Sequence, residues 1–140
     1  MRRGVPITWV RGSAAELPFA TASLDGAYAT WAYFFTGNWD PTPGLTELHR
    51  VVRPGAPLIV VDNLGGDEFS TYSSDDYSAD ADTWATYGFA CEPITTSFEF
   101  DNSADAAALF SLFFGPGTSP PLSVEFRVGL FTSVSSGNPA

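Results

Sequence analysis

The chain alternates short apolar runs with polar stretches rich in glycine and proline, and this pattern predicts an α/β fold. Residues 23–35 and 57–62 are apolar at nearly every position, as in strands covered on both faces of a parallel sheet. Between them, residues 42–53 carry apolar side chains at helical spacing, after a threonine–proline start and before a proline–glycine stop. The two strands and the helix predict a unit with a right-handed crossover.

The rest of the chain predicts further strands and helices around this unit. A short β-rich run covers residues 7–10, and Ser78 is placed to cap a helix that runs to Tyr87 and stops at Gly88. Residues 94–100 and 122–132 alternate apolar and polar side chains, with a helix over 106–114 between them. We therefore expect parallel central strands followed by an antiparallel C-terminal hairpin.

Composition narrows the classes of protein that fit. The chain has 140 residues, 44% of them hydrophobic, enough for one domain, which we expect over residues 1–132 with a flexible tail over 133–140. The net charge is −10 and all basic residues are arginines, which argues against nucleic acid and anionic membranes as partners. The lone cysteine, Cys91, forms no intramolecular disulfide and is interpreted as a small buried hydrophobe.

No long apolar segment is present that predicts export or membrane insertion. Arg11 and Glu16 interrupt the apolar region near the start of the chain before it reaches the length of an export signal. No run approaches the ~20 apolar residues of a membrane span. A cytoplasmic location is the simplest expectation.

Three sequence patterns occur in an order and spacing that point to one family. They are GSAAELPF at residues 12–19, ELHRVVRPGAPLIVVD at 47–62 and YGFACEPITTSFEFD at 87–101. These resemble, in turn, the loop after the third strand, the helix with its Pro-Gly turn and fifth strand, and a late strand of the class I S-adenosylmethionine-dependent methyltransferases of the type 11-like group. The resemblance implies a Rossmann-like sheet, methyl transfer and S-adenosylmethionine as the cofactor.

The front of that family's fold has no counterpart in the residues before position 12. There the family carries a first strand, a glycine-rich loop and helix, and a second strand with an acidic residue that holds the cofactor's ribose. The chain therefore resembles the C-terminal portion of the domain, an incomplete Rossmann-like methyltransferase sheet. Losing several charge-assisted hydrogen bonds weakens binding by thousands-fold, so weak or absent cofactor binding is expected for this chain alone.

The resemblance implies a set of cofactor-binding residues on the adenine side. In the family, the loop after the third strand has an acidic residue at the adenine amino group and then a backbone donor, positions held here by Ser13 and Ala14. Serine departs from the acidic pattern. The end of the fourth strand lines the cofactor cleft, which places Ala29, Thr30 and Trp31 there. Core packing is the alternative interpretation of these three residues.

Aromatic residues just beyond this strand suggest a wall for an apolar or planar methyl acceptor. The expected substrate-binding residues are Tyr33, Phe34, Trp39 and, at the end of the next strand, Asn63; a packed loop is the alternative for the aromatic group. Asp62 and Asn63 close that strand at the ligand edge, where a polar role toward the acceptor or cofactor is expected. His49, in a helical stripe, is interpreted as a packing residue. The acidic run at residues 75–82 lacks the glycine and distal glutamate of a calcium loop, so no metal site is predicted.

Two functions of different classes fit these observations. The first is an S-adenosylmethionine-dependent methyltransferase that acts on a small-molecule acceptor and is truncated, hence weak or inactive alone. Methyl transfer depends mainly on positioning, and no residue stands out as a general base, so no catalytic residue is assigned. The second is a non-catalytic methyltransferase remnant that acts as a dimerising or partner-binding module.

The expected absence of the family's first two strands also leads to a prediction about partner chains. Their loss leaves an exposed strand edge, which predicts a homodimer, strand exchange or a separate chain that supplies the N-terminal half. A start upstream of Met1 is a further alternative. The methyl acceptor is not determined by the sequence.

Overall fold

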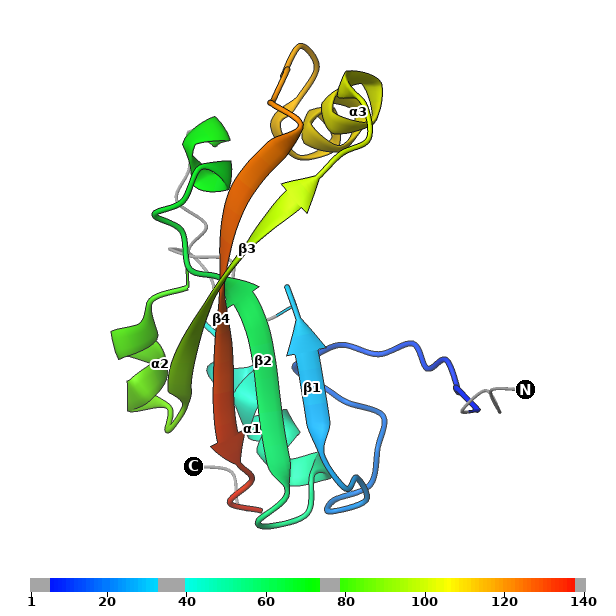
Figure 1. Ribbon diagram of the computed structural model, residues 1–140. Helices are drawn as coiled ribbons and strands as arrows, with labels where there is room; N and C mark the ends of the chain where they lie inside the picture. Colours follow the sequence, from blue (N-terminus) through cyan, green and yellow to red (C-terminus); the bar gives the residue numbers. More distant parts are fainter. Residues whose placement is uncertain (1–5, 33–39, 74–78, 138–140) are drawn as a thin grey trace, which may run out of the picture. The chain divides into compact units, whose positions relative to one another are not determined.

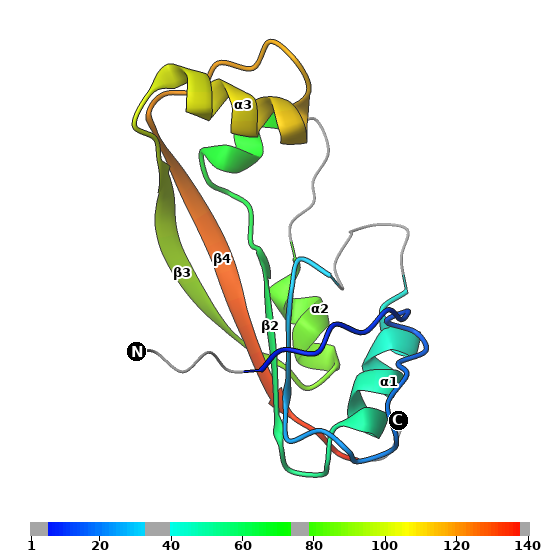
Figure 2. The ribbon, with the colours of Figure 1, turned by 90° about the vertical axis from the view of Figure 1, so that its right-hand side faces the viewer.

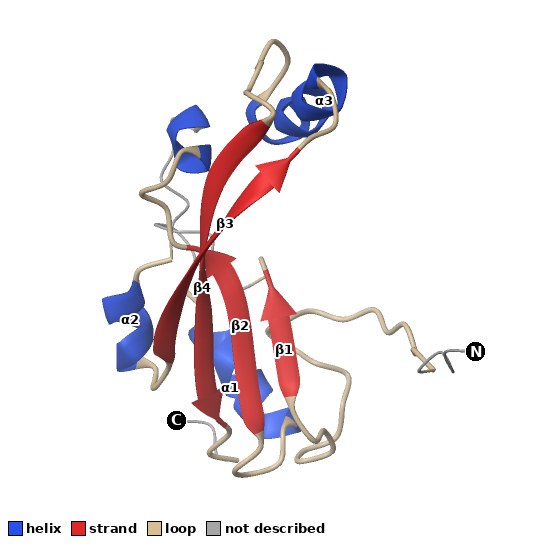
Figure 3. Cartoon of the chain, viewed as in Figure 1, coloured by secondary structure: helices blue, strands red, loops and turns tan. Residues whose placement is uncertain are grey.

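The computed structural model describes residues 6–32, 40–73 and 79–137. Strands and helices alternate along the chain, which confirms the predicted α/β class (Figures 1 and 3). In chain order the elements are β1 (Ala27–Thr30), α1 (Thr42–Val51), β2 (Pro57–Asn63), a 3-10 turn (Phe69–Tyr72), α2 (Ala81–Thr86), β3 (Ala90–Glu99), α3 (Ser103–Phe114) and β4 (Ser123–Val134).

The strands form one mixed sheet in the order β1-β2-β4-β3. Strands β1 and β2 are parallel and the remaining pairs are antiparallel, as Figure 1 shows from the arrows. The backbone N–H of Trp31, just after β1, donates to the carbonyl of Val61 in β2 at 3.0 Å. Strands β3 and β4 pair from Ala90 opposite Thr132 to Glu99 opposite Ser123. The predicted parallel pair and the antiparallel C-terminal hairpin are therefore confirmed.

The chain divides into two compact units, which are described in turn. The first comprises residues 1–27, 40–57 and 134–140, and the second residues 28–39 and 58–133. Each has buried apolar side chains of its own: Leu45, Leu48, Val51 and Val52 in the first, and Leu58, Val60, Phe110 and Phe131 in the second.

An aromatic cluster fills the part of the second unit around α3. Phe69, in the 3-10 turn, has ring centroids of five other phenylalanines within 5.9 Å: Phe98, Phe110, Phe113, Phe114 and Phe126. In Figures 1 and 2, α3 lies across the end of the β3–β4 hairpin with this turn beside it. Helix α3 buries Ala106 and Phe110 toward this cluster, whereas Leu112 is 78% exposed and Phe113 is 59% exposed.

Local capping explains where the helices of the second unit begin and end. The side chain of Asn102 accepts from the N–H groups of Ala104 and Asp105 at the start of α3, and Gly115 at φ +89° ends it. The side chain of Asp80 caps α2 in the same way. The predicted helix over 78–87 is therefore too long at its front, because Asp80 satisfies the first free N–H groups; Ser78 lies outside the described residues.

Two of the predicted strands differ from the structure. Residues 7–10 form no strand: Ile7 is 70% exposed and Trp9 is 90% exposed. A four-residue apolar run forms a strand only when a partner strand pairs with it, and periodicity cannot supply that information. Within the described part of the strand predicted over 23–35, only Ala27–Thr30 form β1, and Trp31 then adopts φ +49°, a left-handed conformation that ends the extended backbone. Residues 33–35 lie outside the described residues.

The C-terminal strand runs two residues further than predicted. Strand β4 ends at Val134, and the next residue, Ser135, is buried and donates its hydroxyl hydrogen bond toward the carbonyls of His49 and Val52. The last three residues of the predicted tail lie outside the described part of the chain. The single-domain assignment with a flexible tail stays a prediction.

Among the residues that the structure describes, no helix is both long enough and apolar enough to cross a membrane.

Candidate functional site

The carboxyl ends of the parallel strands β1 and β2 bring together two of the predicted site residues. Trp31 follows β1 and Asn63 is the last residue of β2. The indole Nε1 of Trp31 donates to Oδ1 of Asn63 at 2.7 Å, while half of the Trp31 surface stays exposed. The backbone of Trp31 is left-handed, with φ +49°. The pair thus presents a flat apolar ring and an amide nitrogen at the edge where open α/β sheets bind ligands.

Asp62, next to Asn63, is the most unusual polar residue at this edge. Only 3% of its surface is exposed, its Oδ1 accepts from the N–H of Asn63 at 2.7 Å, and its Oδ2 has no hydrogen-bond partner. Burial raises the pKa of Asp62 from its ordinary value of 3.8 to about 6. A buried carboxylate oxygen without a partner is costly, and ligand-binding sites are where such groups are expected.

Sequence reasoning placed Asp62 beside Asn63 at the ligand edge, with a polar role toward the acceptor or cofactor, but it did not predict that the Asp62 carboxylate is buried. A signal was available, because Asp62 is the one acidic residue in the apolar run of β2 and shares the inward face with Leu58 and Val60. Alternation along a strand therefore predicts burial of a carboxylate.

Two other predicted site residues, Ala29 and Thr30, lie in β1. Ala29 is half-buried and Thr30 is exposed, and their positions before Trp31 agree with the strand end that was expected to line a cleft. The predicted aromatic wall of Tyr33, Phe34 and Trp39 lies outside the described residues. The roles of all these residues stay predictions.

Ser13 and Ala14, predicted on the adenine side, lie in a tight turn of the first unit. The N–H of Glu16 donates to the carbonyl of Ser13 at 3.1 Å, and the Ser13 hydroxyl accepts from the N–H of Ala15 at 3.2 Å. Ser13 is exposed and Ala14 half-buried. The serine that replaces the family's acidic residue is thus partly engaged within its own turn.

Glu47 and Arg50 of α1 hold the loop at residues 12–19, so two of the sequence motifs are physically joined. Glu47 Oε2 accepts from the N–H of Leu17 at 2.8 Å, and Arg50 donates to the carbonyls of Leu17 at 3.0 Å and Phe19 at 2.9 Å. The two side chains also pair with each other at 2.6 Å. The Arg50 hydrogen bond and then that of Leu17 lower the pKa of Glu47 to about 2.

His49 has a structural role, as its place in the helical stripe predicted. Its Nδ1 accepts from the N–H of Ser136 at 3.1 Å, which ties the chain after β4 to α1, and burial lowers the pKa of the imidazole. Within the described residues, no group of three or more histidine, cysteine or acidic side chains is placed to hold a metal ion.

Comparison with known proteins supports the family that the motifs indicated. Residues 1–60 match the family model described as "Methyltransferase domain". A 2-phytyl-1,4-naphtoquinone methyltransferase of Synechocystis sp. is 36% identical over 58 residues, which cover 41% of this chain and 24% of that protein. An O-methyltransferase of Aspergillus nomiae is 39% identical over 56 residues, 40% of this chain and 24% of that protein. The matches thus span about a quarter of these relatives.

Solved structures extend the likeness beyond residue 60 at the level of the fold. A putative methyltransferase from Bacillus halodurans superposes with a TM-score of 0.57 at 15% identity, over 92% of this chain and 78% of that one. The YcgJ protein of Bacillus subtilis gives a TM-score of 0.54 at 16% identity, over 89% and 69%. The predicted resemblance to class I S-adenosylmethionine-dependent methyltransferases is confirmed, and the sheet is a partial Rossmann-like methyltransferase fold.

Proposed function

We propose that this chain forms the adenine and acceptor side of an S-adenosylmethionine-dependent methyltransferase that acts on a small molecule. The observation that carries the proposal is the edge formed by Trp31, Asp62 and Asn63 at the carboxyl ends of two parallel strands. A half-exposed indole offers a flat surface for a planar ring. The Oδ2 of Asp62 is buried and without a partner, so a hydroxyl or amino group that enters this edge would satisfy it.

The roles of the chain's residues in such a reaction are mainly positional. S-adenosylmethionine supplies a methyl group on a sulfonium centre, which a nucleophilic acceptor atom displaces in line. Trp31 and Asn63 would orient the bound molecules, and Asp62, with a pKa of about 6, is largely ionised at neutral pH and would accept a hydrogen bond from the acceptor. Holding two reactants in line in this way lowers the barrier, because translational and rotational entropy is lost before the reaction step.

The described residues fit one part of the cofactor better than the other. The edge suits the adenosine part, whereas no described loop presents the successive backbone donors that the family's glycine-rich loop gives to the methionine part. Weak cofactor binding by these residues alone therefore remains part of the proposal. A cytoplasmic location remains a prediction.

Calorimetric titration with S-adenosylmethionine and with S-adenosylhomocysteine tests the proposal. We expect saturable binding in the micromolar to millimolar range. Asn63→Ala should weaken it about fivefold, the effect of one neutral hydrogen bond. Trp9→Phe is the matched control, because Trp9 is 90% exposed and far in the sequence from the edge. The absence of a binding signal at millimolar S-adenosylmethionine would refute the proposed enzyme and favour the alternative function.

That alternative is a non-catalytic module that dimerises or binds a partner chain, and the open edge of β1 favours it. Strand β1 has β2 as its one neighbour in the described sheet, and Tyr28 is 75% exposed. Trp31 directs its N–H to β2, so alternation directs the N–H groups of Tyr28 and Thr30 to the unpaired side. A strand from a second copy, or from a chain that supplies the N-terminal half, would pair there.

Light scattering coupled to size-exclusion chromatography tests this pairing. Thr30→Pro removes one outward N–H and should convert the dimer to a monomer, whereas Thr30→Val keeps the N–H and should leave the dimer intact. A monomeric wild-type chain would refute homodimerisation.

A further inference from the structure

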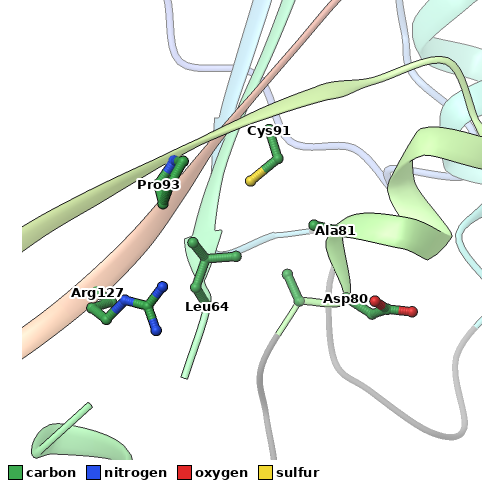
Figure 4. A pocket seen from close by; sticks show the side chains of 7 residues that line it. Leu64, Asp80, Ala81, Cys91, Pro93 and Arg127 are labelled. Atoms are coloured by element: carbon green, nitrogen blue, oxygen red, sulfur yellow. The ribbon is translucent and has the colours of Figure 1, made fainter. Parts of the chain in front are cut away.

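A cavity of about 360 Å³ in the second unit lies outside the edge described above. It is lined by Leu64, Ala79, Asp80, Ala81, Cys91, Pro93 and Arg127, whose side chains are shown in Figure 4. The hairpin register explains the lining, because Pro93 pairs with Gly129 and Thr95 with Arg127, so Cys91, Pro93 and Arg127 share one face of β3 and β4. The volume lies at the lower end of the range for small-molecule sites.

Arg127 is the distinctive group in this cavity. It is the only basic residue in the ranges 28–39 and 58–133, where every other charged residue is acidic. Its side chain is partly buried, and among the described residues no carboxylate forms an ion pair with it. Within the part of the chain that the structure describes, its guanidinium makes one hydrogen bond, from Nη1 to the carbonyl of Gly65 at 3.2 Å, which leaves most of its donors available.

The loop after β2 fixes the position of this guanidinium. A Cβ atom at Gly66 would lie 3.3 Å from Nη1, so the glycine allows the close approach. The backbone N–H of Arg127 donates to Oδ2 of the buried Asp67 at 2.6 Å, which anchors the strand at this position. Figure 4 shows the guanidinium directed toward Leu64, and the Cys91 thiol directed into the same space from β3.

Asp80 is the one acidic group in the lining, and its carboxylate is already engaged. It accepts from the N–H groups of Asp82 at 3.2 Å and Thr83 at 3.3 Å, and from the Thr83 hydroxyl. These hydrogen bonds lower the pKa of Asp80. Figure 4 shows its carboxylate on the side away from Arg127. The cavity therefore offers one available cation and otherwise mainly apolar walls.

We propose that this cavity binds a small organic carboxylate. The planar guanidinium matches a carboxylate in a two-point contact, and Leu64, Pro93 and Cys91 would surround a short aliphatic part. A monoanion fits better than a phosphate, because one arginine amid acidic residues does not balance two negative charges. The buried carboxylate of Asp67, which lies beside the backbone of Arg127, is already engaged by the backbone N–H groups of Ser70 and Arg127. The proposal does not depend on methyl transfer.

The single cysteine makes the cavity directly testable. Iodoacetate and iodoacetamide alkylate a thiol by the same displacement of iodide, but only iodoacetate carries a carboxylate. We expect the ratio of the iodoacetate rate to the iodoacetamide rate to be about tenfold higher at Cys91 of the folded chain than in a short peptide with the same flanking residues. A tenfold increase is the effect of one charge-assisted contact. Comparing ratios at one pH removes the effect of burial, which raises the pKa of the Cys91 thiol.

Matched variants and ligands test whether Arg127 causes the preference of Cys91 for iodoacetate. Arg127→Gln should lower the ratio to that of the peptide, and Arg127→Lys should keep part of it. Arg53→Gln removes an arginine from an exposed pair with Asp25 in the first unit and should leave the ratio unchanged. Butyrate should slow iodoacetamide labelling, whereas its neutral analogue butyramide should not.

Any of three results would overturn the proposal. They are an equal ratio in the folded chain and the peptide, an unchanged ratio in Arg127→Gln, and equal protection by butyrate and butyramide. If Arg127→Gln fails to fold by circular dichroism, the comparison of butyrate with butyramide on the wild-type chain decides. None of these measurements uses the methyl donor, so their failure is distinguishable from failure of the proposed enzyme.

Discussion

Replacing Asp62 by asparagine should remove a pH dependence of stability that burial imposes on this carboxylate. The side chain is 3% exposed and one of its oxygens has no partner. Burial raises its pKa from 3.8 to about 6. At about 1.4 kcal/mol for each pKa unit, ionisation of Asp62 in the folded state costs about 3 kcal/mol.

The sign of the effect follows from the direction of the pKa change. Because the folded state holds the Asp62 proton more tightly than the unfolded state, this group stabilises the fold below the unfolded pKa of 3.8. The contribution is lost as the pH rises through about 6. Between pH 4.5 and 7.5 the wild-type chain should lose about 2 kcal/mol through this group alone.

Urea unfolding at several pH values between 4.5 and 7.5 measures the difference between the wild-type chain and Asp62→Asn. Glu47 and other acidic groups whose pKa is lowered act in the opposite direction, but they are common to both proteins and cancel in the comparison. Burial of the asparagine amide lowers the free energy of unfolding by the same amount at every pH. It therefore shifts the whole curve of stability against pH without changing its slope. Asp101→Asn, at an exposed position, serves as the control. Parallel curves for wild type and Asp62→Asn would refute the reasoning.

Three further predictions concern packing and the loop at residues 12–19. Phe110→Ala should destabilise the second unit by about 3 to 5 kcal/mol in urea unfolding, because Phe110 is fully buried among aromatic rings, whereas Phe113→Ala, at a position 59% exposed, should cost much less. Gly129→Ala should cost about 1 to 3 kcal/mol, since the new Cβ atom would lie 2.6 Å from Cε2 of Phe131; a stability equal to wild type would show that the ring moves freely. Glu47→Gln should speed hydrogen exchange at the N–H of Leu17, which donates to Glu47, and Glu16→Gln in the same loop should not; equal exchange in both variants would contradict the role of Glu47.

Most of the fold was predictable because it depends on local pattern. Apolar runs located the strands that became β1 and β2, and alternation located β3 and β4 to within a few residues. The errors concern features that the local sequence pattern does not determine. Residues 7–10 lack a partner strand, and the backbone of Trp31 turns left-handed at the end of β1. Trp31 and Asn63 lie close together because the carboxyl ends of parallel strands share one edge of a sheet, although their hydrogen bond was not predicted.

The sequence by itself determined the class of fold, the resemblance to methyltransferases and the strand edge at which a ligand is expected. Tertiary structure alone decided which groups lost water and which gained partners across the chain. Asp62 acquires its raised pKa only when the sheet is buried around it, and Glu47 reaches Leu17 thirty positions away. Arg127 borders a cavity because the register of β3 and β4 places it on the face of Cys91 and Pro93. The physical reason is that desolvation and long-range contact are set by three-dimensional packing, which residue spacing along the chain does not specify.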